Sequence, residues 1–321
     1  MAFGETFLHY PDLFPVRRSG ETWGGESLWV DFVGGPYRFT GLSADQKRAL
    51  VARFGPLSCD VPPAVTADVV PISIFRVGAG EFRGVELRGW HYTFDRDYGA
   101  DAVRVAGLDF MGWIDFFPTT RGTFWTPLGS LPDDDAVACF QCQVENYFRL
   151  LVAYRLVALG GALLHSAGVV SELGASVFFG HSGAGKTTIS RLGQADGRTV
   201  LSDDMNALCP DGEGFVVEKL PFAGDLGRTP GPRSRHRLRA LCRLRKGPND
   251  VTPLRPASAV AQLLASAPFV NADPHRLESL TDNLESLASR VGVHQLTFSL
   301  EGGFWPLLDA LEPRAAVTAG P

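Results

Sequence analysis

The sequence lacks a long uninterrupted run of apolar residues. Its longest apolar stretch, residues 150–164, contains Arg155 and two glycines, and a stretch of this kind cannot span a bilayer. The first fourteen residues, MAFGETFLHYPDLF, have neither a basic start nor a continuous apolar segment, so we expect no signal peptide. These absences predict a cytoplasmic protein with no membrane partner.

Cysteine is scarce as well. The five cysteines are an odd set without the spacing of a disulfide framework, which favours a reducing compartment. Cys139 and Cys142 form a C-x-x-C pair, but this pair lies in a strongly helical stretch with no second ligand pair nearby. We therefore expect buried or half-buried helix residues there, rather than a redox or zinc site.

The chain also lacks excess positive charge, and its net charge of −5 argues against a general nucleic-acid binder. It has 26 arginines but only 4 lysines, a skew that often follows genome base composition. A single arginine is therefore weak evidence for function, whereas a lysine inside a motif is stronger evidence. The length of 321 residues fits one large domain or two domains that share an interface.

The pattern of residues 1–130 predicts a mainly β region that could present a substrate. Residues 27–40 are predicted to form two short strands around a Gly-Gly-Pro turn. Ser43 then begins a helix, with Gln46 placed to complete a capping box. Residues 68–130 alternate aromatic and β-branched residues with polar ones, which indicates an antiparallel meander.

Residues 131–313 are predicted to form an α/β domain with a mixed sheet, followed by a disordered tail at 314–321. A long helix is expected over 136–159 and ends at two glycines. The elements expected after it are a hairpin of strands 162–170 and 175–180, a short helix from Lys186, a strand at 198–204, helices at 257–265 and 275–291, and a strand at 293–300.

The hairpin leads into a glycine-rich loop that matches G-x-x-x-x-G-K-[ST], the phosphate-binding motif of many nucleotide-binding proteins. Glycines let successive backbone N–H groups point at phosphate oxygens, and the following helix adds the positive end of its dipole. The lysine neutralises β- and γ-phosphate charge, and the next hydroxyl can bind Mg²⁺. The predicted ATP-binding residues are Gly180, His181, Ser182, Gly183, Ala184, Gly185, Lys186, Thr187 and Thr188.

Two adjacent carboxylates, Asp203 and Asp204, end the next strand, 17 and 18 residues beyond Lys186. An apolar strand that ends in aspartate beside such a loop is where a magnesium ligand is expected. One carboxylate would hold the metal, and the other would accept the proton of an attacking hydroxyl. The alternative is a polar strand end without a chemical role.

Three further features are candidate parts of the site. His165 lies in the strand before the loop and is either a satisfied core residue or a group in the active site. Asp225, in a loop between glycines, is a candidate third metal ligand. The segment 228–246 carries eight basic residues and no acidic one, and it is either a mobile lid that covers a triphosphate or binds an acidic substrate, or a solvated arginine-rich face.

The run LLHSAGVV, the hairpin, GHSGAGKTT and VLSDD together resemble the catalytic core of HPr kinase/phosphorylase, whose fold is shared with phosphoenolpyruvate carboxykinases. The resemblance is to the branch that includes the serine kinases of lasso-peptide precursors, and it is closest over residues 160–210. It implies that Asp204 accepts the proton of the substrate serine, that Thr187 binds Mg²⁺, and that His165 lies at the active site. Relatives of this kind commonly assemble as homo-oligomers.

The chain departs from this family in two places. The later signature with a Glu-Ile-Arg-Gly core, which supplies a metal-binding glutamate, is absent, and Asp225 stands roughly in that region. The downstream loop linked to phosphorolysis is not recognisable either. The resemblance therefore implies kinase activity without HPr as the substrate and without the reverse reaction.

The leading hypothesis is an ATP- and Mg²⁺-dependent kinase that phosphorylates a hydroxyl on a peptide, a protein or a small molecule. A second hypothesis is a nucleotide-dependent regulatory module with little catalysis. A carboxykinase-like decarboxylase is disfavoured because the chain is short for that family. Motor ATPases are disfavoured because they usually have a longer course between the loop and the metal-binding aspartate.

Overall fold

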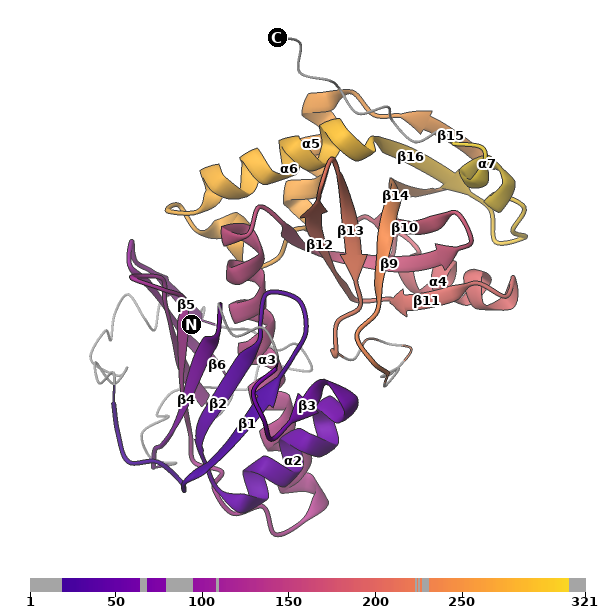
Figure 1. Cartoon of the computed structure of the whole chain (residues 1–321). Helices are drawn as coiled ribbons and strands as arrows, with labels where there is room; N and C mark the ends of the chain where they lie inside the picture. Colours follow the sequence, from indigo (N-terminus) through magenta and orange to yellow (C-terminus); the bar gives the residue numbers. More distant parts are fainter. Residues whose placement is uncertain are drawn as a thin grey trace. The chain divides into compact units, whose positions relative to one another are not determined.

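The computed structural model describes residues 19–63, 68–78, 95–107, 110–222, 224, 226 and 231–311. The chain divides into two compact units (Figure 1). Unit 1 contains Met1–Leu151 with Pro230–Pro232, and unit 2 contains Val152–Thr229 with Arg233–Pro321. The described residues form six α-helices and two eight-stranded sheets, each with parallel and antiparallel pairs, so the fold is mixed α/β as predicted. Among these residues we find no helix that combines the length and the apolar composition needed to span a bilayer.

Unit 1 is built on the first sheet, with strand order β3-β1-β2-β4-β8-β7-β6-β5. Its strands are β1 (Glu26–Val30), β2 (Tyr37–Leu42), β3 (Ser58–Cys59), β4 (Val70–Arg76), β5 (Asp95–Tyr98), β6 (Ala102–Gly107), β7 (Phe110–Asp115) and β8 (Arg121–Thr126). Its helices are α2 (Ala44–Phe54), the short 3-10 helix η2 (Gly55–Leu57) and the first part of α3 (Asp134–Ala158).

The predicted meander is confirmed for β5 to β8, which pair antiparallel in sequence order. It is wrong for β4, which pairs parallel with both β2 and β8. Alternation of side chains is the same in both kinds of pair, so the sequence pattern could not distinguish them. The part of the predicted meander at residues 84–94 lies outside the described residues.

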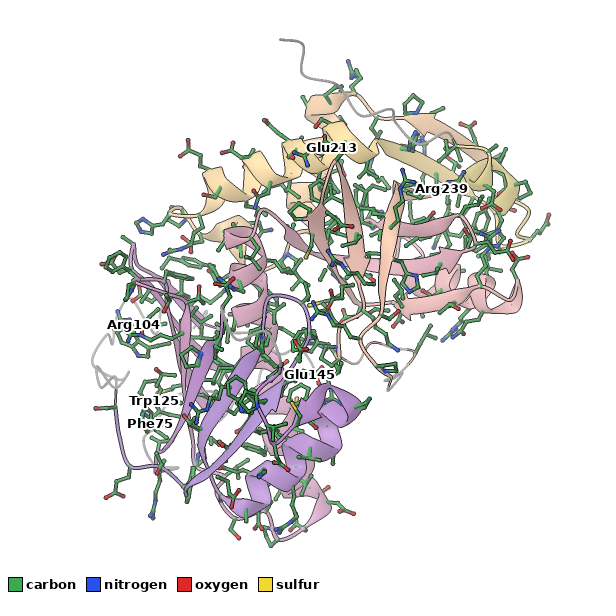
Figure 2. All side chains as sticks on the ribbon, in the orientation of Figure 1. Phe75, Arg104, Trp125, Glu145, Glu213 and Arg239 are labelled. Atoms are coloured by element: carbon green, nitrogen blue, oxygen red, sulfur yellow. The ribbon has the colours of Figure 1, made fainter. Side chains whose placement is uncertain are left out.

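Helix α3 explains why the units divide at Leu151 rather than near residue 130, where the sequence placed the boundary. The first part of the helix belongs to unit 1, because its aromatic side chains pack in the core of that unit. The Phe148 ring meets the rings of Phe39 and Phe54 edge-on, with centroids 5.4 and 5.6 Å away. Phe75 on β4 and Trp125 on β8 lie opposite each other in the same sheet, with ring centroids 5.8 Å apart (Figure 2).

The predicted capping box at the start of α2 is confirmed. The Ser43 hydroxyl accepts from the Gln46 backbone N–H at 3.1 Å, and the Gln46 side-chain oxygen accepts from the Ser43 backbone N–H at 2.9 Å. Gln46 is fully buried, and its Nε2 also donates to the carbonyl oxygen of Leu128 at 2.8 Å. One side chain therefore both caps the helix and attaches it to the chain after β8.

Replacing Gln46 with alanine is expected to lower the free energy of unfolding by about 1–3 kcal/mol, because it removes two side-chain hydrogen bonds and leaves their partly buried partners unsatisfied. Urea denaturation of the full chain measures the change. Arg48→Ala on the same helix is the control, because the Arg48 side chain is 72% exposed and its ion pair with Asp45 contributes little. Equal midpoints for Gln46→Ala and the wild type would contradict the expectation.

Unit 2 is built on the second sheet, and it contains the predicted hairpin, short helix and late strand. Its strands are β9 (Ala162–Ser171), β10 (Gly174–Phe179), β11 (Thr199–Ser202), β12 (Met205–Asp211), β13 (Gly214–Glu218), β14 (Arg235–Lys246), β15 (Asp250–Pro253) and β16 (Val293–Phe298). Its helices are the last residues of α3, then α4 (Lys186–Ala195), α5 (Pro256–Ser266), the 3-10 helix η4 (Val270–Ala272), α6 (Leu277–Val291) and α7 (Trp305–Asp309).

Five strands of unit 2 pair in a closed ring, in the order β9, β12, β13, β14 and β10. The pair of β10 with β14 is parallel, and the other pairs in the ring are antiparallel. A buried cluster next to β10 and β14 includes Phe178, Ile189 of α4 and Trp305 of α7. This packing fixes α4 against the sheet, and so it fixes the loop from which α4 starts.

Residues 235–246 of the basic segment do not form a lid, because they form β14 inside the sheet. The solvated-face interpretation holds for part of this strand, where Arg235, Arg237, Arg245 and Lys246 are exposed. Leu238, Ala240, Cys242 and Leu244 alternate along the strand and are buried. Burial raises the pKa of the Cys242 thiol to about 12. Residues 228–230 of the predicted segment lie outside the described residues.

Arginines can occupy this strand because their heads reach polar atoms at its edge or the solvent. Arg239, labelled in Figure 2, donates from its Nη2 to the carbonyl oxygens of Asp309 and Leu311 at 2.5 and 2.7 Å.

Candidate functional site

The glycine-rich loop connects β10 with α4, in the strand–loop–helix arrangement that the sequence predicts. Three of its glycines have positive φ angles: 155° at Gly180, 78° at Gly183 and 110° at Gly185. A Cβ atom at Gly185 would lie 2.7 Å from the Phe298 ring, and one at Gly180 would lie 2.9 Å from the Ala184 side chain. The loop thus depends on glycine both for its backbone angles and for its close packing.

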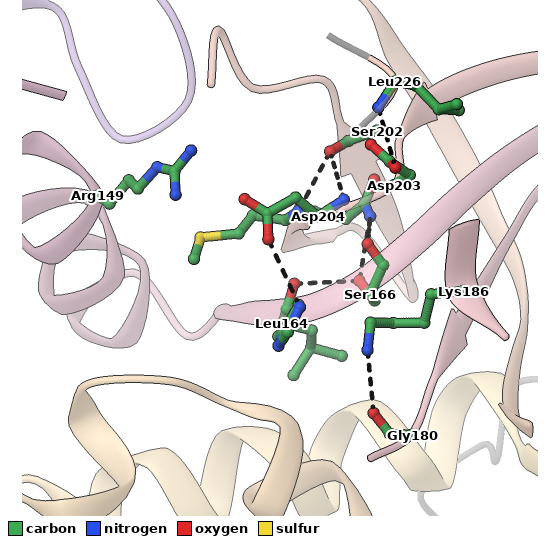
Figure 3. A network of polar contacts seen from close by, with 12 residues as sticks. Arg149, Leu164, Ser166, Gly180, Lys186, Ser202, Asp203, Asp204 and Leu226 are labelled. Carbon is green, nitrogen blue, oxygen red and sulfur yellow. Dashed lines mark hydrogen bonds and ion pairs between the residues drawn. The ribbon is translucent and has the colours of Figure 1, made fainter. Parts of the chain in front are cut away.

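The lysine of the motif folds back over this loop. Lys186 begins α4, is only 9% exposed, and donates from Nζ to the Gly180 carbonyl oxygen at 3.3 Å (Figure 3). The His181 ring is held against its own loop, because Nδ1 donates to the Ser182 carbonyl oxygen at 2.6 Å. An amine held at the N-terminus of a helix, beside a glycine loop, is an arrangement that attracts anions.

The two aspartates lie where the partner of β9 changes from β11 to β12. Ser202 at the end of β11 pairs with Gly168 of β9, and Met205 at the start of β12 pairs with His165. Asp203 and Asp204 fill the break between these pairs. The Asp204 carbonyl oxygen accepts from the backbone N–H of Ser166 at 2.9 Å, which ties the break to β9.

A serine on the same segment fixes the backbone of this break. The Ser202 hydroxyl accepts from the backbone N–H groups of Asp204 and Met205, both at 3.1 Å (Figure 3). Side-chain contacts of this local kind hold a turn without needing a regular ladder. The direction of the Asp203 and Asp204 side chains is thus determined by the segment itself and by β9.

The surroundings of the two carboxylates differ. Asp203 is 6% exposed, and its Oδ2 accepts from the Leu226 backbone N–H at 3.2 Å. Gly224 lies so close that an added Cβ atom would come within 2.2 Å of Asp203 Oδ1. The Asp204 side chain is more open, and its Oδ1 lies 3.5 Å from Nε2 of His165, whose side chain is 49% exposed. Asp203 is therefore held in place, whereas Asp204 can be reached and has an imidazole beside it.

An open cavity of about 710 Å³ joins the loop, the aspartates and the histidine. Of the predicted site residues, Gly180 lies beneath Lys186, Ala184 is buried in the core, and His181 borders a second pocket. The remaining predicted site residues that the structure describes all line this cavity. Its lining residues are His165, Ser182, Gly183, Gly185, Lys186, Thr187, Thr188, Asp203, Asp204, Gly224 and Lys246.

Two residues of the cavity were missed in the sequence, and one predicted ligand is not described. Gly224 and Lys246 line the cavity without having been predicted. Lys246 had a signal, because it is one of only four lysines and ends the basic segment. Gly224 had none, because its role depends on the position of Asp203. Asp225 lies outside the described residues.

The donor set fits magnesium bound together with a nucleotide. Within the described part of the chain, no group of three or more histidine, cysteine, aspartate or glutamate side chains is placed to hold a metal ion. Thr187 and Asp203 supply a hydroxyl and a carboxylate to the cavity. Mg²⁺ is commonly bound by one or two protein oxygens of this kind, with phosphate oxygens and water completing its shell.

Compared with models of known protein families and with curated protein sequences, the chain matches none. The chemistry of the cavity is therefore inferred from its own residues. A glycine loop with a buried lysine favours a phosphate chain, and two aspartates of unequal exposure favour a division between positioning and proton transfer.

Proposed function

We propose that this chain is an ATP-dependent kinase that transfers the γ-phosphate to a hydroxyl acceptor, of the serine type, on a peptide, a protein or a small molecule. The observation that carries the proposal is the single cavity lined by Lys186, Thr187, Asp203 and Asp204. A binding loop alone would explain only the first two. An accessible carboxylate beside the loop adds a group that can activate an acceptor.

The residues have separate roles in this proposal. The loop backbone and Lys186 hold the phosphates, and Thr187 and Asp203 hold Mg²⁺. The metal, when bound, neutralises charge on the phosphates. Asp204 takes the proton of the acceptor hydroxyl while the hydroxyl oxygen forms a bond to the γ-phosphorus. The bond between the γ-phosphorus and the bridging oxygen breaks, and ADP leaves with that oxygen. His165, 3.5 Å from Asp204, orients this carboxylate or shares its proton.

The proposal agrees with the resemblance to HPr-kinase-like enzymes. We propose that the chain belongs to that family. Two limits follow from the departures in the sequence. HPr is not proposed as the acceptor, and phosphorolysis is not proposed as a reverse reaction. Unit 1 is proposed to recognise the acceptor, since no motif in its sequence gives it chemistry of its own.

Two measurements on the full chain test the proposal. Calorimetric titration with ATP·Mg²⁺ measures binding, and ATP labelled at the γ-phosphate measures transfer to serine peptides, to lysate proteins and to water. We expect binding that needs Mg²⁺, and label on an acceptor. If ATP binds but neither an acceptor nor water ever takes the phosphate, the chain is a nucleotide-dependent regulatory module instead. Failure to bind ATP would exclude both functions.

A further inference from the structure

A second pocket, of about 400 Å³, adjoins the cavity described above. The two share Gly183 of the loop and Lys246 at the end of β14. His181, which does not line the first cavity, borders this one. The pocket therefore opens next to the proposed site of transfer and is not a separate feature of the surface.

The pocket has an unusual concentration of positive charge. Arg243, Arg245 and Lys246 come from the end of β14, and Gln295 comes from β16, where it pairs with Arg243. Arg243 and Arg245 share one face of the strand, because the buried Leu244 between them points to the other. None of the described residues that line the pocket is acidic.

These three cations have no ion pair with any carboxylate of the described residues. In the same strand, Arg235 pairs with Asp211 at 3.3 Å, and just before it Arg233 pairs with Glu218 at 2.7 Å. Two of the arginines at the other end of β14 are therefore compensated, whereas the three cations at the pocket are not. Uncompensated cations gathered in a concave site raise the local concentration of anions.

The lining favours an oxyanion over a nucleobase. Guanidinium groups bind carboxylates and phosphates through paired hydrogen bonds, and Gln295 can donate a further one. The described lining of the pocket contains no Phe, Tyr or Trp on which a base could stack. Its one ring is the imidazole of His181, which is held to the loop by a hydrogen bond from Nδ1 to the Ser182 carbonyl oxygen.

We propose that this pocket binds an anionic group of the phosphate acceptor, a carboxylate or a phosphate, next to the hydroxyl that is modified. The proposal rests on the proposed kinase function, and it narrows the acceptor to an acidic molecule. Arg243 and Arg245 bind the anionic group, and Lys246 lies between this group and the phosphates of the nucleotide.

Binding of fluorescent serine peptides to the full chain, followed by anisotropy, tests this. Three peptides carry glutamate, glutamine or phosphoserine beside the serine, and each is measured without nucleotide and with a non-hydrolysable ATP analogue. We expect the wild type to bind the glutamate peptide about tenfold or more tightly than the glutamine peptide. Tighter binding of the phosphoserine peptide than of the glutamate peptide would assign the pocket to phosphate rather than carboxylate.

The variant Arg243→Ala/Arg245→Ala is expected to lose this preference and to keep the ATP affinity of the wild type. Arg237→Ala is the matched control, since Arg237 is an exposed arginine on the same strand that does not line the pocket. No preference in the wild type, or a preference that survives in the double variant, would overturn the proposal. A double variant that loses affinity for ATP but keeps the preference for the glutamate peptide would also overturn the proposal, because the pocket would then bind the nucleotide.

The peptide measurements without nucleotide separate this proposal from the kinase function. If the wild type does not bind ATP but binds acidic peptides through Arg243 and Arg245, the kinase function fails and the anion pocket stands. If ATP binds and is used but acidic peptides are not preferred, the anion pocket fails and the kinase function stands.

Discussion

Replacing Lys186 with alanine is expected to weaken ATP·Mg²⁺ binding by about 30- to 150-fold, because a charge-assisted contact contributes about 2–3 kcal/mol. The Lys186 amine is confined between the loop and the cavity, with Nζ 3.3 Å from the Gly180 carbonyl oxygen. It lies beside the loop whose backbone N–H groups we propose to bind the phosphate oxygens. Calorimetric titration of the variant with ATP·Mg²⁺ measures the loss.

Lys47→Ala is the matched control for this loss. It removes the same charge, but Lys47 belongs to unit 1, where it pairs with Glu26 at 3.1 Å and Asp60 at 2.8 Å. We expect this variant to bind ATP as the wild type does. Circular dichroism and thermal unfolding establish that both variants are folded. Unchanged affinity in a folded Lys186→Ala protein would mean that the loop does not bind a phosphate chain, whatever its sequence.

The loop and hairpin could be predicted because their signals are local. Strands β9 and β10 are adjacent in sequence and joined by a short turn, and the loop needs positive φ angles that the glycines at 180, 183 and 185 reveal directly. Asp203 and Asp204 were found by their distance from Lys186 along the chain. All of these signals belong to short segments, so they can be recognised in the sequence before the fold is known.

Strands β12, β13 and β14 were not predicted, and the reason differs among them. The β12–β13 hairpin does have a turn signal, Asp-Gly-Glu-Gly at 211–214. In β14 the arginines concealed a regular alternation of buried residues, from Leu238 to Leu244. The closed ring of strands also needs the parallel pair of β10 with β14, which joins segments far apart in the chain.

In the site, too, contacts between distant segments could not be predicted from local sequence patterns. That Asp204 lies 3.5 Å from His165 depends on the register of β12 on β9, where Met205 stands opposite His165. A shift of one residue would move the imidazole to the other face of the strand. Lys246 and Gly224 reach the cavity only through β14 and through the chain near Leu226. Sequence motifs thus identify the loop and the two aspartates, whereas strand register places His165 and Lys246 beside them.

Replacing Asp204 with asparagine is expected to slow phosphoryl transfer by about 10²- to 10⁴-fold, the usual contribution of a general base, with ATP affinity close to that of the wild type. Asparagine keeps the shape of the side chain and its contact with His165, but it cannot take the proton of the acceptor. Asp204 is partly exposed, with a relative side-chain exposure of 23%, so the substitution leaves no buried charge unpaired. Transfer of the γ-phosphate to the acceptor, at saturating ATP, measures the rate.

The neighbouring Asp203→Asn variant separates proton transfer from metal binding, because the two carboxylates differ in burial but not in chemistry. Asp203 is 6% exposed and held by the Leu226 N–H, so its proposed contribution is to the position of Mg²⁺. The Asp203→Asn variant should need a higher Mg²⁺ concentration for half-maximal ATP binding. The Asp204→Asn variant should need the same Mg²⁺ concentration as the wild type but transfer phosphate more slowly at saturating ATP. If Asp204→Asn transfers phosphate at the wild-type rate, the proton must leave by another route, and His165 becomes the residue to replace next.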